Sequence, residues 1–384
     1  MNSVIQWIAA ELCDSALTLE DREHGSEAER ERLYRLSKAH DLAHVVGNGL
    51  FRHGALPDTS AWTPKFKKQM MLAMFRYEQL QATLAELCEA LEEAEIPFVP
   101  LKGSVLRQYY PQPWMRTSCD IDILIHEEDL ARAGEWLQTH LSYRKEDVSS
   151  HDMSLFSPAE VHLELHYDLV EERFAKESRA ILRDVWQRVT PKEGYRYWHE
   201  MTDEMFYFYH VAHMAKHFEM GGCGIRAFLD IWVLDHRVAH EDGVRDDLLA
   251  QGGLATFAQA SRALSEYWFS GREPDQLTLQ MEQYVLSGGV YGTQVNQVSV
   301  QQGRQGGKIA YAMSRIFLKY DALRFHYPIL QRHKWLFPLM QVRRWGKLIF
   351  LGGMKRSVRE LKTNQTITKD AADQMKDFIH RVGL

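Results

Sequence analysis

The sequence predicts an α+β fold, in which a mixed β-sheet is flanked by a mainly α-helical N-terminal region and an α-helical C-terminal domain. Two observations carry this prediction. Short runs of β-forming residues, separated by helical patterns, are confined to residues 96–168. On both sides of that stretch, apolar residues recur at the spacing of amphipathic helices. We therefore expect a helical region over residues 1–62, an α/β domain over 63–175 and a helical domain over 176–384.

The N-terminal region begins with apolar residues at helical spacing, among them Val4, Ile8 and Leu12. Residues 64–95 continue this pattern over a longer stretch, where apolar residues are interleaved with Lys, Gln and Glu. At 1.5 Å per residue, this stretch makes one helix of about 45 Å. We expect its apolar residues to belong to the core, namely Met71, Met74, Phe75, Leu80, Leu84, Leu87 and Leu91.

The central domain is expected to contain five strands, at residues 96–101, 120–125, 141–148, 152–156 and 161–167. Gly103 and Ser104 directly follow the first of these strands and open a helical pattern. A second helix is expected after the second strand and ends at about His140. This alternation of strands and helices predicts a mixed sheet with helices packed on it.

Beyond residue 175 the strand patterns fade, and helical patterns dominate. We expect helices at residues 180–188, 203–218, 225–240 and 254–269. Residues 287–307 contain six glycines among Gln, Asn and Ser, so they predict a flexible loop before the last helices.

Composition and charge exclude several classes of protein. The 46 Lys and Arg against 52 Asp and Glu give a net charge of -6, which argues against a protein whose main role is to coat nucleic acid or an anionic membrane. The acidic balance also disfavours a long RNA as a partner, whereas a local basic patch remains open. The four cysteines form no C-x-x-C pair, which fits a reducing cytoplasm. No signal peptide pattern and no apolar run near the roughly 20 residues of a membrane span are present. We therefore expect a cytoplasmic protein without stable membrane insertion.

A pair of carboxylates is the first candidate for chemistry. Because side chains alternate between the two faces of a strand, Asp120 and Asp122 project from the same side of the 120–125 strand. Two carboxylates in this arrangement can hold Mg²⁺ against a substrate phosphate. The alternative interpretation is the solvated face of an edge strand.

Two neighbouring segments favour the metal site. Lys102, Gly103 and Ser104 lie at a turn from strand to helix, where free backbone N–H groups can bind phosphate. On the 161–167 strand, three alternate residues share one face, which makes Glu164 a candidate third carboxylate between His162 and His166. An anion site with three carboxylates is what two-metal phosphoryl or nucleotidyl transfer requires.

These residues resemble the uncharacterised nucleotidyltransferase family of the DNA polymerase β-like superfamily, whose signature is a Gly-Ser turn, an Asp-x-Asp strand and a third acidic residue on a later strand. The third acid here is Glu rather than the more usual Asp. We expect the resemblance to cover about residues 60–300. It includes Leu101, Lys102 and Gly103, then Tyr109 or Tyr110, Arg116, residues 120–125 and 164–167, and further His210, His213, His217, Arg226, Asp230, Gly289 and Gly292.

The resemblance implies a mechanism and makes 63–175 the nucleotidyltransferase catalytic domain. Asp120, Asp122 and Glu164 would hold two Mg²⁺ ions, for which Mn²⁺ could substitute, and Glu164 could instead act as a base. The nucleotide site would comprise Lys102, Gly103, Ser104 and Arg116. The expected reaction transfers AMP from ATP to an acceptor and releases pyrophosphate. A small molecule, a sugar, a peptide and a protein all remain open as the acceptor.

The histidines raise a rival hypothesis. His210, His213 and His217 recur on one face of the expected 203–218 helix, and imidazole nitrogens at such spacing can bind Zn²⁺, as in a zinc-dependent hydrolase. We favour structural roles for these histidines, because no cysteine or Glu-x-x-His pattern accompanies them. His166, His213, His217 and Arg226 are candidates for the acceptor side of the site. A third hypothesis is a catalytically degenerate protein that binds nucleotide without turnover.

Residues 324–356 form a basic and aromatic segment, with Trp335, Trp345 and Phe350 among several Arg and Lys residues. This composition allows contact with a membrane surface or an anionic acceptor. The alternative is a helix that packs its apolar stripe and solvates its charges.

Overall fold

The computed structural model describes residues 2–13, 26–149, 151–170, 175–290, 292–327, 329–350 and 354–384. The chain divides into two compact units. The first unit comprises Met1–Lys216 and Cys223–Val290, and the second unit comprises His217–Gly222 and Tyr291–Leu384. The domain boundaries expected at 62/63 and 175/176 both fall inside the first unit. The three-domain division therefore stays a prediction.

Within its described residues, the first unit begins with the helices α1 (Ser3–Leu12), α3 (Glu27–Ala39) and α4 (Ala43–Arg52). Local capping explains where the first two begin: the Asn2 side chain accepts a hydrogen bond from the Val4 N–H, and Ser26 and Glu29 form a capping box. Helix α5 (Thr63–Glu93) follows and is the long helix that the sequence predicts.

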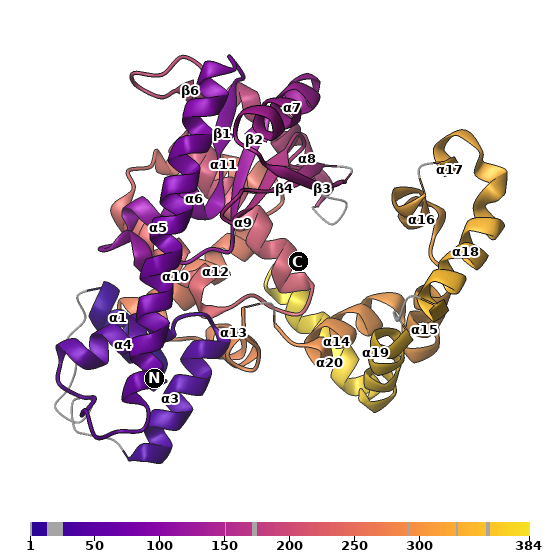
Figure 1. Ribbon diagram of the computed structural model, residues 1–384. Helices are drawn as coiled ribbons and strands as arrows, with labels where there is room; N and C mark the ends of the chain where they lie inside the picture. Colours follow the sequence, from indigo (N-terminus) through magenta and orange to yellow (C-terminus); the bar gives the residue numbers. More distant parts are fainter. Residues whose placement is uncertain are drawn as a thin grey trace. The chain divides into compact units, whose positions relative to one another are not determined.

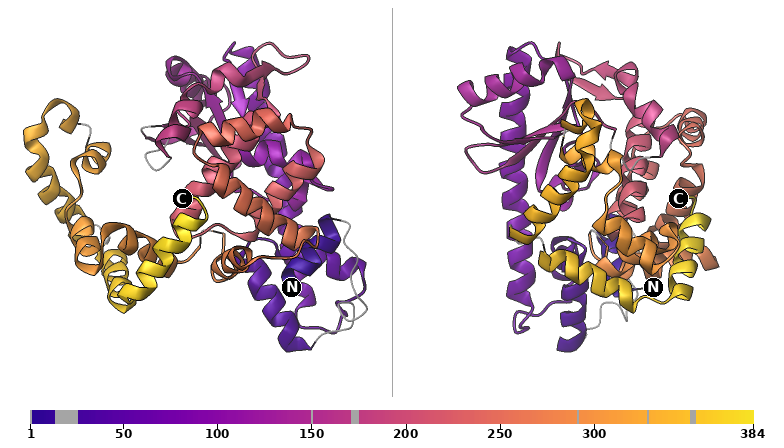
Figure 2. Two further views of the ribbon diagram at one scale, coloured as in Figure 1. Left: turned by 180° about the vertical axis from the view of Figure 1, so that it is seen from behind. Right: turned by 90° about the vertical axis from the view of Figure 1, so that its right-hand side faces the viewer.

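Helix α5 connects the N-terminal helices to the sheet, as Figure 1 shows, and Figure 2 shows the same arrangement from two further sides. Its C-terminal half buries Leu80, Leu84, Leu87 and Leu91, as expected. The expectation that Met71, Met74 and Phe75 belong to the core is wrong: their exposed fractions are 70%, 38% and 67%. Their side chains therefore lie on a part of α5 that the other described residues do not cover.

The mixed sheet has five strands in the order β1-β2-β5-β4-β3. The pair β2 and β5 is parallel, and the other three neighbouring pairs are antiparallel. The strands are β1 (Phe98–Pro100), β2 (Asp120–Ile125), β3 (Arg144–Val148), β4 (Asp152–Phe156) and β5 (His162–His166). The predicted α+β class, with this sheet over residues 98–166, is confirmed.

The two faces of the sheet differ in chemistry. On one face, Ile121, Ile123, Leu163 and Leu165 are buried in a core with α5 and α7 (Leu130–His140). Because side chains alternate along a strand, the polar residues of β2 and β5 must project from the opposite face. The local pattern of these two strands therefore separates the core from the candidate site.

The rest of the first unit is mainly helical. A short antiparallel pair, β6 (Val189–Pro191) and β7 (His199–Met201), adds two strands that were not expected after residue 175, where helical patterns dominate. This pair is held by contact of β7 with β1, which no local sequence pattern reveals. The helices are α6 (Lys102–Leu106), α8 (Lys176–Arg183), α9 (Asp203–Glu219), α10 (Ile225–Arg237), α11 (Asp242–Gln251), α12 (Ala255–Phe269) and α13 (Gln276–Leu286).

The second unit corrects the loop expected at residues 287–307. Residues 294–305 form helix α14 (Gln294–Gln305), which begins where the Thr293 hydroxyl accepts a hydrogen bond from the Asn296 N–H. A Cβ at Gly303 would lie 2.6 Å from the Ala372 carbonyl oxygen, so this glycine permits close packing of two helices rather than a turn. The remaining helices are α15 (Lys308–Ile316), α16 (Tyr320–His326), α17 (Ile329–Arg332), α18 (Phe337–Phe350), α19 (Met354–Thr366) and α20 (Lys369–Arg381).

Within the described residues, no helix combines the length and the apolar composition that crossing a bilayer would need.

Candidate active site

The pairing of β2 with β5 brings the predicted acidic residues together. Asp122 lies opposite Glu164, and Asp120 lies opposite His162 in the parallel register. Ligand atoms of Asp122, Glu164 and His166 lie within 4.8 Å of one another, and the same holds for Asp120, His162 and Glu164. Glu164 belongs to both groups, so the structure places it where the sequence predicts a third carboxylate.

Asp122 is buried and carries two hydrogen bonds from cations. The Lys102 Nζ and the His166 Nε2 both lie 2.8 Å from Asp122 Oδ1. Burial alone would raise the pKa of Asp122, but the Lys102 charge and the His166 hydrogen bond outweigh it and hold this pKa well below its usual range. Asp122 is therefore a stable carboxylate at neutral pH.

His166 forms a bridge between two acids. Its Nε2 also lies 3.3 Å from a Glu164 oxygen. Burial would lower the pKa of His166, but the hydrogen bonds to Asp122 and Glu164 raise it to about 9. His166 is therefore protonated at neutral pH and donates to both carboxylates.

For Asp120 the nearby charges of Lys102 and His162 lower the pKa, but they do not outweigh the effects that raise it. Burial, followed by the charge of Asp122, raises the pKa of Asp120 above its usual value. A carboxylate in this position is stabilised by any additional cation that approaches both aspartates. His162 lies on the same face, where its Nε2 and the Ser154 hydroxyl are 2.7 Å apart.

The expected phosphate-binding turn lies beside this face. Lys102 begins α6 with a φ of 45°, which is a left-handed conformation that is uncommon outside glycine. Gly103 is required by close packing, because a Cβ there would lie 2.9 Å from the Ser118 Cβ. The Ser104 Oγ is buried without a hydrogen-bond partner. Ser104 also lines a cavity of about 510 Å³, but the other lining residues, such as Tyr77 and Trp198, include none of the three candidate carboxylates. An unpaired buried hydroxyl is uncommon and indicates a position for a ligand.

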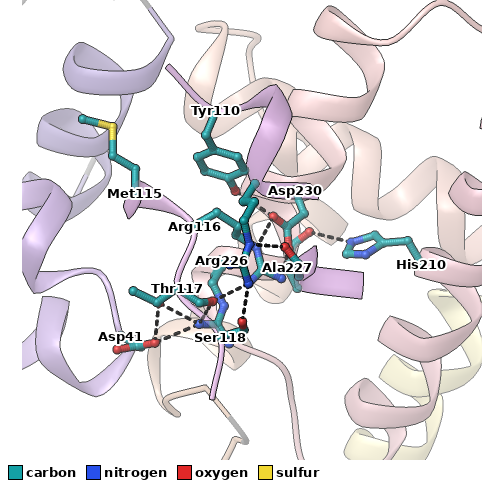
Figure 3. Close-up of polar contacts among 12 residues, drawn as sticks. Asp41, Tyr110, Met115, Arg116, Thr117, Ser118, His210, Arg226, Ala227 and Asp230 are labelled. Carbon is teal, nitrogen blue, oxygen red and sulfur yellow. Dashed lines mark hydrogen bonds and ion pairs between the residues drawn. The ribbon is translucent and has the colours of Figure 1, made fainter. Parts of the chain in front are cut away.

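Arg116, predicted to contact the nucleotide, is engaged elsewhere in the structure. Its Nε and Nη2 donate to Asp230 Oδ1 and Oδ2 at 2.7 and 2.9 Å, and its Nη1 donates to the Thr117 carbonyl (Figure 3). The Tyr110 hydroxyl donates to the same carboxylate at 2.6 Å. With only 10% of its side chain exposed, Arg116 supports the loop before β2 from the side of α10.

Two further arginines hold this loop. Arg226, a candidate for the acceptor side, donates through Nη1 to Asp41 at 2.8 Å and to the Thr117 carbonyl at 3.0 Å (Figure 3). Buried Arg107 donates to the Ser118 hydroxyl at 2.8 Å. No local sequence pattern marks Asp41 or Arg107 as part of the site, and the partners of Asp41 are 76 and 185 residues away along the chain.

The three helix histidines are not gathered into a metal-ligand set. Within the described part of the chain, the groups of His, Cys, Asp and Glu that could hold a metal ion are the two on β2 and β5. His210 Nε2 lies 3.4 Å from the Ala227 carbonyl (Figure 3), and burial lowers the pKa of this histidine. His217 falls in the second unit.

A mixed sheet with carboxylates on two adjacent strands is consistent with a nucleotidyltransferase fold. The chain belongs to a family of uncharacterised nucleotidyltransferases, which matches residues 26–270. This match confirms the resemblance and supports nucleotidyl transfer as the general activity. It begins further towards the N-terminus than residue 60 and includes α3 and α4. It ends at residue 270, before Gly289 and Gly292, which the resemblance was expected to include. Searches of curated proteins and of solved structures found no match.

Proposed function

We propose that this protein is a Mg²⁺-dependent nucleotidyltransferase of the polymerase β-like type, which transfers a nucleoside monophosphate to an acceptor and releases pyrophosphate. The observation that carries the proposal is the juxtaposition of Asp120, Asp122 and Glu164 on one face of two paired strands. We propose ATP as the donor. The acceptor is a small molecule, a sugar, a peptide or a protein.

The donor set suits a hard divalent cation. Carboxylate oxygens are the ligands that Mg²⁺ prefers, and Mn²⁺ also accepts an imidazole nitrogen such as that of His162. Burial, followed by repulsion from Asp122, raises the pKa of Asp120, and this supports the assignment because a bound cation would stabilise the charged carboxylate. Asp120, Asp122 and Glu164 would hold the metal, which supplies charge neutralisation at the phosphates and activation of the acceptor hydroxyl.

The other residues of the site act on charge and position. Lys102, with its Nζ on Asp122, is close enough to the carboxylates to offset charge on the triphosphate. Ser104 Oγ is free to donate to a phosphate oxygen. Glu164 would either ligate the metal or accept the proton of the acceptor hydroxyl, and His166 would keep Asp122 and Glu164 in place through its two contacts. Gly103 keeps the turn close to Ser118.

The test is incubation with each labelled nucleoside triphosphate and Mg²⁺, followed by a search for a labelled product, together with calorimetry of nucleotide binding. We expect binding that requires the metal and is lost in Asp120→Asn/Asp122→Asn. Asp147→Asn on β3 is the matched control, since Asp147 is exposed and its carboxylate accepts a hydrogen bond from the N–H of the neighbouring Val148. Folded protein that binds no nucleotide at millimolar concentration with Mg²⁺ or Mn²⁺ would exclude the proposal. Binding without any product in extracts rich in acceptors would favour the degenerate binder.

A further inference from the structure

The second unit contains a long stretch without negative charge. Residues 322–359 include nine Arg and Lys residues and no Asp or Glu, although the whole chain has a net charge of -6. A block of like charges of this length is unusual in a folded unit, because it repels itself. We call residues 322–359 the basic segment.

The basic segment also exposes large apolar side chains in a regular order. Trp335, Leu339 and Val342 are 76%, 57% and 57% exposed. Their spacing of four and three residues continues from a short turn at Lys334–Leu336 into α18 (Figure 1), so they form one stripe along the helix. The exposed stripe is not the core-facing side of α18. The opposite side of this helix has its own core contact, where Met340 is buried with Leu323, Tyr327 and Leu330.

Cations flank the apolar stripe. Arg332, Lys334, Arg343 and Lys347 are all exposed within the same segment. Arg343 and Lys347 lie above the Tyr327 ring at 5.7 Å, which holds them on the outside of the small core. Exposed Trp and Leu next to Arg and Lys are typical of helices that lie in the plane of a membrane interface.

Helix α15 adds a second stripe of the same kind. Ile309, Met313 and Ile316 recur at helical spacing and are 81%, 48% and 40% exposed. The end of α15 is joined to α18, where the Trp345 Nε1 donates to the Ile316 carbonyl at 2.8 Å. The apolar exposure of this unit is therefore a repeated feature and not one isolated side chain.

We propose that the basic segment binds the surface of an anionic lipid bilayer, with the stripe of Trp335, Leu339 and Val342 inserted at the level of the headgroups. Lipid phosphates complement the nine positive charges, and the acyl boundary takes up the apolar stripe. A nucleic acid would match the charges but would leave the aliphatic side chains in water. A second copy of the same surface would place like charges against each other. The inference rests on the second unit alone and does not depend on the proposed enzymatic function.

The experiment is co-sedimentation of the full-length protein with vesicles of phosphatidylcholine, alone or mixed with phosphatidylglycerol. We expect binding to the anionic vesicles only, weakened at high salt because surface charges are then screened. In Arg332→Gln/Lys334→Gln the partition coefficient should fall roughly 25-fold, at about fivefold for each charge near the surface. Lys68→Gln/Lys145→Gln removes two exposed charges outside the basic segment and should bind normally.

The apolar stripe is tested by Trp335→Glu/Leu339→Glu, which should abolish binding, while Trp335→Phe should retain it. Because these side chains are exposed, the circular dichroism and thermal unfolding of the variants should match those of the parent. The matched control is Met71→Glu/Phe75→Glu on α5, where equally exposed apolar residues lie outside the basic segment.

Three results would overturn the inference. The first is absence of binding to anionic vesicles at low salt. The second is equally tight binding of single-stranded RNA that survives Trp335→Glu/Leu339→Glu, which would indicate a nucleic-acid surface. The third is a dimer in light scattering that dissociates in the same variant, which would indicate that a second copy covers the stripe.

Discussion

Arg116 and Asp230 form a buried ion pair with two parallel hydrogen bonds, of 2.7 and 2.9 Å. Arg116 lies four residues before Asp120, and Asp230 lies in the middle of α10. The pair therefore fixes the loop that leads into the carboxylate strand. A bidentate pair of this kind combines energy with directionality, which a single contact would not provide.

Breaking this pair from one side is predicted to be costly. Asp230→Ala leaves the Arg116 guanidinium buried without its partner and should lower the free energy of unfolding by about 3–5 kcal/mol. Urea denaturation measures this change. The exposed pair of Lys67 and Asp58 is the control, and Asp58→Ala should change stability little. A loss of stability in Asp230→Ala no larger than that in Asp58→Ala would contradict the structural role.

The role of Glu164 separates turnover from binding. Glu164→Gln should leave Mg²⁺-nucleotide binding largely intact and reduce turnover by roughly 10²- to 10⁴-fold, as for the loss of a catalytic base. Calorimetry and product formation with a known acceptor measure the two effects separately. Glu146→Gln on the exposed strand β3 is the matched control. Turnover at the level of the parent would move the third-carboxylate role to Asp152, Glu160 or Asp168.

Substitution of Ser104 and of Ser118 by alanine should have different effects on stability and on nucleotide affinity. Ser104→Ala removes a buried hydroxyl without a partner, so stability should be unchanged or slightly higher, while nucleotide affinity falls roughly 10- to 100-fold. Ser118→Ala removes one of the two hydrogen-bond acceptors of buried Arg107, the other being the Gly103 carbonyl, and should cost about 1–3 kcal/mol of stability. Thermal unfolding with and without Mg²⁺-ATP measures both changes. An unchanged nucleotide affinity in Ser104→Ala would exclude this hydroxyl from the site.

The buried His40 side chain should make the free energy of unfolding depend on pH. It is fully buried, accepts a hydrogen bond from the Ile225 N–H at Nδ1, and burial lowers its pKa to about 4. Between about pH 6.5 and pH 4 the unfolded chain binds a proton that the folded protein excludes, so stability falls as the pH falls through this window. The loss is roughly 3 kcal/mol at 1.36 kcal/mol for each pKa unit.

The measurement is urea unfolding at pH 7 and pH 4. His40→Gln, which does not titrate, should show a correspondingly smaller loss of stability between these values than the parent protein. Exposed His333→Gln should behave as the parent does. The same acid sensitivity in His40→Gln and in the parent would assign the effect to other groups.

The local sequence pattern was sufficient to predict those features of the site that depend on a single strand. Alternation along β2 places Asp120 and Asp122 on one face, and alternation along β5 does the same for Glu164 and His166. The signature residues also predicted the family. Exposure of Met71 and Phe75 could not be predicted, because amphipathic spacing shows which face is apolar and not whether another element covers it.

The sequence by itself determined which side chains share a strand face, where α5 lies and to which family the chain belongs, because each of these depends on residues close together in the chain. Only the tertiary structure decided that Asp122 lies opposite Glu164, that Arg116 bonds to Asp230 and that residues 294–305 form a helix. These three features are all relations between distant segments. They are the register of two strands, the pairing of Arg116 with a residue 114 positions away and the close packing of two helices at Gly303. Their energies arise only once the chain has folded, so no local pattern records them.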